Sequence, residues 1–384
     1  MPNPGLSEDE CLEAIRLVSE YGSITEAARI IGMNRETLQS RVNVARRRIA
    51  SGTLEGELAE RVPEGHKVKG TSTLFDEAGA VRLQWVKTDI DQERAEMARE
   101  AAIQALCADI PRAVPVSPPG ASQAALCSLY TLTDGHVGML AWHREGGQDW
   151  DLQIAEDTIV GCFAEAIRQA PPSAQAILNQ LGDLLHYDGL TAETPTSGHI
   201  LDADGRFTKM VEGAVRIIRR IIAMLLEKHA TVHVIMAEGN HDMASSVWLR
   251  TMLKALYEDE PRITVDDSAL PYYAFQWGGV MLGFHHSHLK RNFKDLRAHM
   301  AAQFPQMWGE TQKRYCHTGD KHHAAEKDEM GMHVIQHPTL AARDAYAARG
   351  GWHSERNMSV ITYHKNFGQV GRVTVCPEML EAAA

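Results

Sequence analysis

The sequence lacks the segments that direct a chain to a membrane or out of the cell. The N-terminus has no basic stretch followed by an apolar run, so we expect no signal peptide. No window of about 20 apolar residues occurs, so we expect no membrane span. The six cysteines are scattered along the chain without a C-x-x-C pair. They are therefore expected to be reduced thiols in a cytoplasmic protein.

The chain also lacks an excess of positive charge. Its formal net charge is -11, so any contact with nucleic acid must come from a local patch or a metal site. The 384 residues leave room for two domains, and the 44% of apolar residues is ordinary for a globular protein. The abundant residue is histidine, with 19 copies, many beside Gly, Asp or Asn.

The N-terminal part, residues 1–50, has the pattern of three short helices. Ser7 with Glu10 is typical of a capping box, Ser23 precedes a second helix, and Asn34 precedes a third after Gly32. This spacing predicts a helix-turn-helix module. The third helix carries the candidate DNA-binding residues Arg35, Arg41, Arg46, Arg47 and Arg48. Two alternatives stay open, because arginines also suit a helix C-terminus and such modules also bind proteins.

Residues 51–125 connect this module to the rest of the chain. The patterns predict, in order, a linker, a β-hairpin with its turn at 76–79, a charged helix and a proline-rich boundary, over residues 51–65, 66–88, 90–108 and 111–122.

Residues 126–384 alternate short apolar runs with helical stretches, which indicates an α/β domain. Strands are expected at 127–133, 176–181, 232–237, 262–266, 272–276, 279–285 and 314–317, and in the tail near 332–336, 358–364 and 370–376. Helices are expected at 151–170, 207–229 and 243–257.

Five polar segments follow predicted strands, where ligands of layered α/β folds collect. They are Asp134-Gly135-His136, Gly182-Asp183, Gly239-Asn240-His241-Asp242, His285-His286-Ser287-His288 and Gly319-Asp320-Lys321-His322-His323. Asp and His two residues apart in an extended chain point the same way and can share one cation. An amide oxygen such as that of Asn240 is a neutral metal ligand.

The order of these segments resembles the motifs of the calcineurin-like metallophosphoesterase superfamily, D-x-H, G-D, G-N-H-[D/E], H and G-H-x-H. The resemblance covers about residues 128–325. It implies an α/β fold, a four-layer α/β/β/α sandwich, here with a small all-α helix-turn-helix domain before it.

The resemblance also implies a role for each matching residue. Asp134, His136 and His322 would bind a first metal, and Asp183 would bridge both metals. Asn240 and one histidine of the fourth segment would bind the second metal; His285, where the strand ends, is preferred, with His286 as the substitute. His241 would be the catalytic acid, and Asp242 would hold its ring.

Two positions depart from the family pattern. Asp320 stands where the family has the first His of G-H-x-H, and as a carboxylate it can still bind a hard cation. His186 stands where relatives have an acid or Asn, and Asp188 could take over that role.

A bridging carboxylate with mixed N and O ligands suits a pair of divalent cations, and Mn²⁺ is favoured over Mg²⁺, Fe or Zn²⁺.

The chain also resembles phage and prophage metallophosphoesterases that carry an N-terminal helix-turn-helix. We therefore expect a DNA nuclease whose partner is DNA. A homodimer is an open alternative for its oligomeric state. A phosphatase or phosphodiesterase for small molecules or phosphoproteins is the second hypothesis. A DNA-binding adaptor with a degenerate site is the third.

Overall fold

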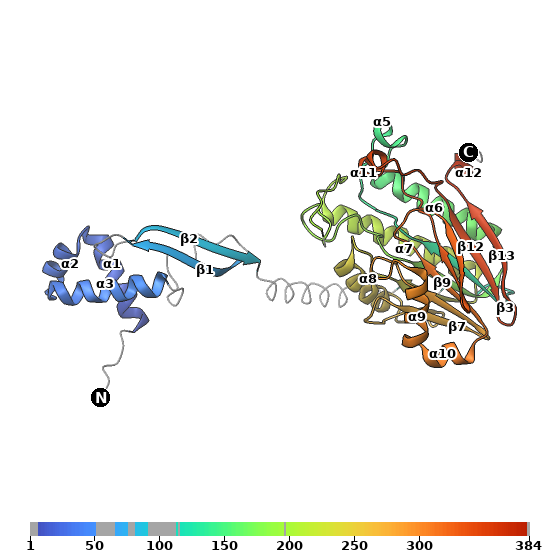
Figure 1. Ribbon diagram of the computed structural model, residues 1–384, viewed down its shortest axis with the longest axis horizontal. Helices are drawn as coiled ribbons and strands as arrows, with labels where there is room; N and C mark the ends of the chain where they lie inside the picture. Colours follow the sequence, from blue (N-terminus) through green and yellow to red (C-terminus); the bar gives the residue numbers. More distant parts are fainter. Residues whose placement is uncertain are drawn as a thin grey trace. The chain divides into compact units, whose positions relative to one another are not determined.

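A computed structural model describes residues 7–50, 66–75, 81–90, 113, 116–195 and 197–381. The chain divides into two compact units, Met1–Gln104 and Ala105–Ala384 (Figure 1).

The first unit begins with three helices, α1 (Glu8–Tyr21), α2 (Ile24–Ile31) and α3 (Arg35–Ala50). The capping box is confirmed, because the Ser7 hydroxyl accepts from the Glu10 amide at 3.2 Å and the Glu10 carboxylate accepts from the Ser7 amide at 2.9 Å. The Ser23 hydroxyl accepts from the Glu26 amide at 3.2 Å and so caps α2. Gly32 ends α2 at φ 69°, in the left-handed region that glycine adopts without strain.

A β-hairpin follows in the same unit. Strands β1 (His66–Phe75) and β2 (Val81–Ile90) pair antiparallel, which confirms the predicted hairpin. The predicted turn at 76–79, linker at 51–65 and charged helix at 90–108 lie outside the described residues, apart from Ile90 at the end of β2.

The second unit contains two sheets (Figure 1). The first has the strand order β13-β12-β3-β4-β5-β6, with β3 to β6 parallel and β12 and β13 antiparallel to their neighbours. These strands span Gln123–Leu132 (β3), Ser173–Gln180 (β4), Thr231–Met236 (β5), Ile263–Val265 (β6), Met358–His364 (β12) and Gly368–Val375 (β13). Each overlaps a predicted strand.

The second sheet has the order β10-β11-β9-β8-β7, with β8, β9 and β11 parallel. Its strands span Tyr273–Trp277 (β7), Val280–Phe284 (β8), Lys313–Thr318 (β9), Ala325–Glu329 (β10) and Met332–Gln336 (β11). The prediction missed β10, whose sequence Ala-Glu-Lys-Asp-Glu has no apolar alternation. An edge strand that pairs on one side only tolerates such charge.

Alternate residues along the central strands pack into different cores. Tyr130, Leu178 and Val234 pack with helices α6 (Leu152–Gln169), α7 (Phe207–Lys228) and α8 (Met243–Leu256). Leu129, Ile177 and Ile235 pack instead against Leu282 and Phe284 of the second sheet. The other face of that sheet packs against α9 (Phe293–Gln303) through Met281, Cys316 and Met300. The two sheets therefore lie face to face, each covered outside by helices.

The three helices predicted for this unit are confirmed as α6, α7 and α8. Four short helices lack a sequence pattern long enough to predict them: α5 (His143–Gly146), α10 (Pro305–Glu310), α11 (Ala345–Arg349) and α12 (Glu378–Glu381). Among the described residues, no helix combines the length and apolarity that crossing a membrane requires.

Candidate metal centre

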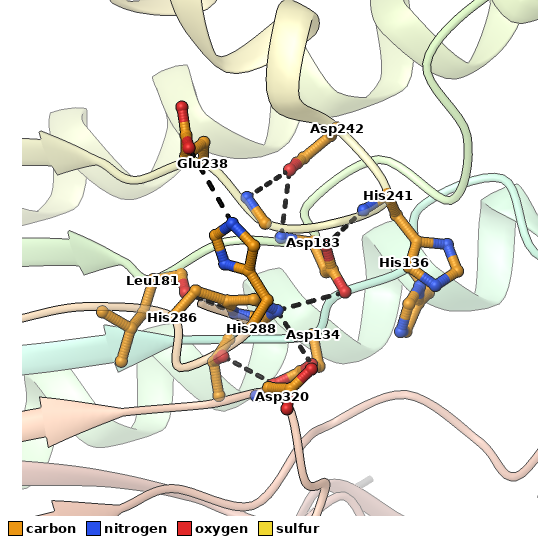
Figure 2. Close-up of polar contacts among 12 residues, drawn as sticks. Asp134, His136, Leu181, Asp183, Glu238, His241, Asp242, His286, His288 and Asp320 are labelled. Carbon is orange, nitrogen blue, oxygen red and sulfur yellow. Dashed lines mark hydrogen bonds and ion pairs between the residues drawn. The ribbon is translucent and has the colours of Figure 1, made fainter. Parts of the chain in front are cut away.

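The carboxyl ends of β3, β4 and β8 bring three buried side chains together. Asp134 follows β3, and Asp183 follows β4 after the turn at Gly182. The His286 Nε2 atom lies 3.2 Å from Asp183 Oδ2 and 3.9 Å from Asp134 Oδ1 (Figure 2). Gly182 is required here, because a Cβ on it would lie 2.6 Å from the His286 ring. Parallel strands thus deliver these side chains to one edge of the two sheets.

A second group of donors shares Asp134. The His322 Nε2 atom lies 3.1 Å from Asp134 Oδ1 and 3.3 Å from His136 Nε2. The donors of Asp134, His136 and His322 all lie within 4.8 Å of one another, as do those of Asp134, Asp183 and His286. Asp134 is therefore common to both groups. The bridging role that the resemblance implies for Asp183 stays a prediction.

Charge within the cluster favours anionic carboxylates. Burial by itself raises the pKa of Asp134, but the charges of His322 and His286 outweigh it and lower that pKa to about 2. The pKa of Asp183 is lowered as well, since His286 and His241 outweigh its burial. Burial opposes protonation of His286, yet the two carboxylates raise its pKa to about 10. The cluster thus attracts positive charge, which a divalent cation would supply while displacing these protons.

The residues present fit such cations. Asn240 Oδ1 is buried without a hydrogen-bond partner, which is unusual for a polar atom in a protein interior, and Asp134 Oδ1 and His286 Nε2 are buried with only ionic contacts inside the cluster. Burial lowers the pKa of His136 well below its usual value, so its imidazole is neutral, as a metal ligand must be. Carboxylate, amide and imidazole donors together suit first-row divalent metals.

The fourth segment requires a correction. The sequence-based choice among its histidines was His285, but the structure places His286 in the cluster. The His285 Nδ1 atom lies 2.8 Å from the Pro271 carbonyl oxygen, and its ring stacks on Tyr272. Successive residues of a strand point to opposite sides. His286 lies on the side whose residues point inward, so its neighbour His285 faces away from the cluster.

His241 lies at the edge of the cluster. Its Nδ1 atom donates to the His186 carbonyl at 2.7 Å, and its ring lies 4.7 Å from that of His136, between centroids. Its backbone amide donates to Asp183 Oδ1 at 2.8 Å. Nε2 is therefore the nitrogen left to meet a substrate.

The role expected for Asp242 was wrong. Its carboxylate does not contact the His241 ring; it accepts the amide hydrogens of Asp183, Leu184, Leu185 and Gly239 at 3.2, 2.7, 3.2 and 2.9 Å. Burial and the nearby charge of Asp183 raise the pKa of Asp242 to about 7. Asp242 thus ties the loop after β5 to the loop after β4.

The fifth segment closes the cluster from the second sheet. The Asp320 amide donates to Asp134 Oδ2 at 3.2 Å, while its carboxylate forms an ion pair with Lys321. A Cβ on Gly319 would lie 2.0 Å from Thr133 Oγ1, so only glycine allows this approach. Asp320 therefore lies beside the cluster, and one oxygen of its carboxylate is engaged by the Lys321 ammonium group.

The sequence marks His186 only as a departure from the family pattern, but the structure gives it a specific contact. Its Nδ1 atom lies 3.3 Å from His136 Nδ1, and its ring stacks on His241. It can therefore fix the orientation of His136, as outer partners of metal-bound histidines do. Asp188 does not take over this place; it accepts the Ala244 and Ser245 amides at the start of α8.

The arginines predicted to bind DNA lie in the first unit. Arg35 lines a hollow of about 300 Å³ on α3 together with Gln39 and Asn43. Arg41 instead forms an ion pair with Glu10 of α1, at 3.5 Å. The side chains of the other three, Arg46, Arg47 and Arg48, lie outside the described part of the chain.

Comparison with known proteins gave matches among solved structures alone: no family model and no curated protein matches this chain. A conserved Streptococcus pneumoniae protein described as a predicted phosphoesterase is 11% identical, with TM-score 0.29, over 66% of this chain and 99% of that one. An archaeal phosphodiesterase is 11% identical, with TM-score 0.33, over 65% and 99%.

A dimetal phosphatase from Danio rerio is 8% identical, with TM-score 0.33, over 66% of this chain and 99% of the phosphatase. Similarities at this level of identity and TM-score carry no functional argument.

Proposed function

We propose that this chain is a phosphodiesterase that uses two divalent cations to cleave DNA. The observation that carries the proposal is the pair of overlapping donor groups, Asp134 with His136 and His322, and Asp134 with Asp183 and His286. Two cations held this close activate water and neutralise phosphate oxygens during in-line attack. Mn²⁺ suits the mixed oxygen and nitrogen donors, with Mg²⁺, Fe or Zn²⁺ as alternatives.

The surrounding residues have separate tasks in this proposal. Asn240 and Asp320 complete the donors on the side of His286. His241, with Nδ1 committed to the His186 carbonyl, exchanges a proton with the leaving oxygen through Nε2. Asp242 keeps the two loops in register through its four backbone contacts.

The first unit supports DNA as the substrate. Helices α1, α2 and α3 pack on one another around Ala28, Leu38 and Val42, in the order of a helix-turn-helix module. The hollow on α3 presents Arg35, Gln39 and Asn43, which are side-chain types that read base edges in the major groove.

Exposed aromatic side chains in the second unit also support a nucleic-acid substrate. Trp142 precedes α5, while Tyr346 and Trp352 lie in and after α11; all three are at least half exposed. Helices α5 and α11 contact one another (Figure 1). Arg343 joins the two helical segments, because it donates to the Gly146 and Trp352 carbonyls. Exposed aromatic rings can stack on unpaired bases.

This aromatic surface is anchored to the metal centre. Thr339 Oγ1 donates to the Asp134 carbonyl at 2.6 Å and accepts from the Ala341 amide at 2.9 Å. A nucleic-acid strand that stacks on these aromatic side chains would therefore be held at a fixed distance from Asp134.

Two alternatives have specific support. The same donors would serve a phosphatase or phosphodiesterase for small molecules or phosphoproteins. The ion pair between Asp320 and Lys321 favours a DNA-binding adaptor that has lost its second cation. We also propose a cytoplasmic location and, as an open alternative, a homodimer.

The test is an assay on labelled single- and double-stranded DNA with Mn²⁺, Mg²⁺ or a chelator. We expect cleavage that needs Mn²⁺ and disappears in Asp183→Asn, because that substitution removes a buried carboxylate from the donors. Turnover limited to nitrophenyl esters or cyclic nucleotides would support the small-molecule alternative. A wild-type protein that binds well under one cation per chain would support the adaptor.

A further inference from the structure

The donors available to the second cation are weakened in this chain. Asp320 occupies a position where a second imidazole is expected, and Lys321 forms an ion pair with its carboxylate. His286 then remains as the imidazole in the group that contains Asp183. Such a site has one imidazole and a carboxylate that Lys321 partly neutralises. Compared with a site that has two imidazoles, it favours soft metals less and binds first-row cations more weakly.

His288 is a buried imidazole without a hydrogen-bond partner. Its side chain is 6% exposed, and neither ring nitrogen makes a hydrogen bond. The nearest ionic group is Glu238, whose Oε1 atom lies 3.8 Å from His288 Nε2 (Figure 2). Buried polar atoms in native proteins nearly always have a partner, so two unpartnered ring nitrogens mark a place that can bind a cation.

The loop places His288 on the cluster side of β8. Ser287 has φ 97°, a conformation that breaks the strand alternation and turns the chain after His286. The His288 ring consequently lies 5.6 Å from the His286 ring and also 5.6 Å from the His285 ring, between centroids.

We propose that His288 is a ligand of the second cation, oriented by Glu238, and that it supplies the imidazole that Asp320 does not. A carboxylate that holds one ring nitrogen while the other meets a metal is a common arrangement around metal-bound histidine. The inference rests on the proposed two-cation function. It adds a ligand that the motif pattern does not assign.

The experiment measures metal binding rather than turnover. Three proteins are compared: wild type, His288→Ala and the control His323→Ala. Each is freed of metal and titrated with Mn²⁺. Metal analysis counts the bound cations, and electron paramagnetic resonance detects the coupled pair. His323 is exposed and lies on the neighbouring loop. We expect two cations in wild type and His323→Ala. In His288→Ala the first cation stays, while affinity for the second falls by about tenfold or more and the coupled signal is lost.

A rescue variant tests the compensation directly. If His288 replaces the missing imidazole, Asp320→His should restore second-cation affinity in the His288→Ala background. His288→Gln, which keeps a polar side chain of similar reach, guards against a folding defect and should also bind the second cation weakly. Wild-type affinity for both cations in His288→Ala and His288→Gln overturns the inference. Failure of wild type itself to bind two cations instead overturns the proposed function.

Discussion

At the scale of single residues, backbone conformation aims side chains into the cluster. Residues other than glycine rarely adopt positive φ, and each one costs on the order of 1–3 kcal/mol. Six of the seven such residues in the described chain lie in the loops around the cluster: Asp134, His136, Asp183, Ser287, Asp320 and His322. Such strain is retained where the surroundings and the function of a site require it.

His241→Ala should separate catalysis from metal binding. Because His241 Nδ1 is committed to a carbonyl and Nε2 faces the substrate side in the proposed mechanism, its loss should lower turnover by about 10²–10⁴-fold. Metal analysis should still find both cations. If His241→Ala lost both, a ligand role would replace the proton-transfer role assigned to it.

His229 should make the stability of the second unit depend on pH. It is fully buried between Tyr130 and Ser173, and burial lowers its pKa to about 4. The unfolded chain, with a histidine pKa of about 6.5, binds more protons between pH 4 and 6.5. Stability is therefore full above pH 6.5 and falls with pH through this window, by on the order of 3 kcal/mol.

Urea unfolding of the metal-free protein at pH 4 to 7 measures this effect. We expect His229→Asn to be less stable than wild type at pH 7 but to lose less stability on acidification. His323→Asn, at an exposed position, should keep the wild-type slope. An unchanged slope in His229→Asn would contradict the prediction.

At the scale of elements, the site depends on how closely loops approach one another. The loop after β5 passes over the loop after β4 at Gly239. A Cβ there would lie 1.9 Å from Asp183 Oδ1 and 2.4 Å from Asp183 N. Two parallel strands can therefore present Asp183 and Asn240 to one place only if glycine separates their loops.

Gly239→Ala should accordingly displace Asp183. We expect loss of at least one cation and a fall in turnover of about 10²-fold or more, on the scale of a displaced catalytic group. Gly189→Ala is the matched control, because a Cβ at Gly189 meets nothing within 4 Å. Metal analysis and thermal unfolding distinguish a displaced ligand from a misfolded protein. Full metal content in Gly239→Ala would show that the loops can adapt.

At the scale of the whole molecule, two compact units divide the proposed work. The second unit holds every residue of the donor groups, and the first holds the helix that we propose reads DNA. This division allows affinity for DNA and affinity for metal to change independently.

Arg35→Ala should weaken binding of duplex DNA by about tenfold and leave the metal content unchanged, because Arg35 lines the hollow on α3. Fluorescence anisotropy with a labelled duplex at fixed salt measures the affinity. Arg16→Ala on α1 is the control, as Arg16 is exposed and paired with Glu13. Equal losses in both variants would indicate a general effect of charge rather than a reading helix.

The sequence predicted much of the framework because local patterns carry it. Apolar runs marked the central strands, and the capping residues Ser7 and Ser23 marked the first helices. The same reasoning missed β10, since a charged edge strand has no alternation to detect. It also could not locate α5 or α11, which are too short to show helical periodicity.

What only the tertiary structure decided is which polar atoms meet. The spacing of Asp134, Asp183 and His322 predicted a cation site, because residues after parallel strands end at one sheet edge. The choice between His285 and His286 depended on strand parity at β8. The partner of Asp242 depended on how two loops cross, and the surroundings of His288 depended on the conformation of Ser287. Such contacts join residues distant in sequence, and no local propensity encodes them.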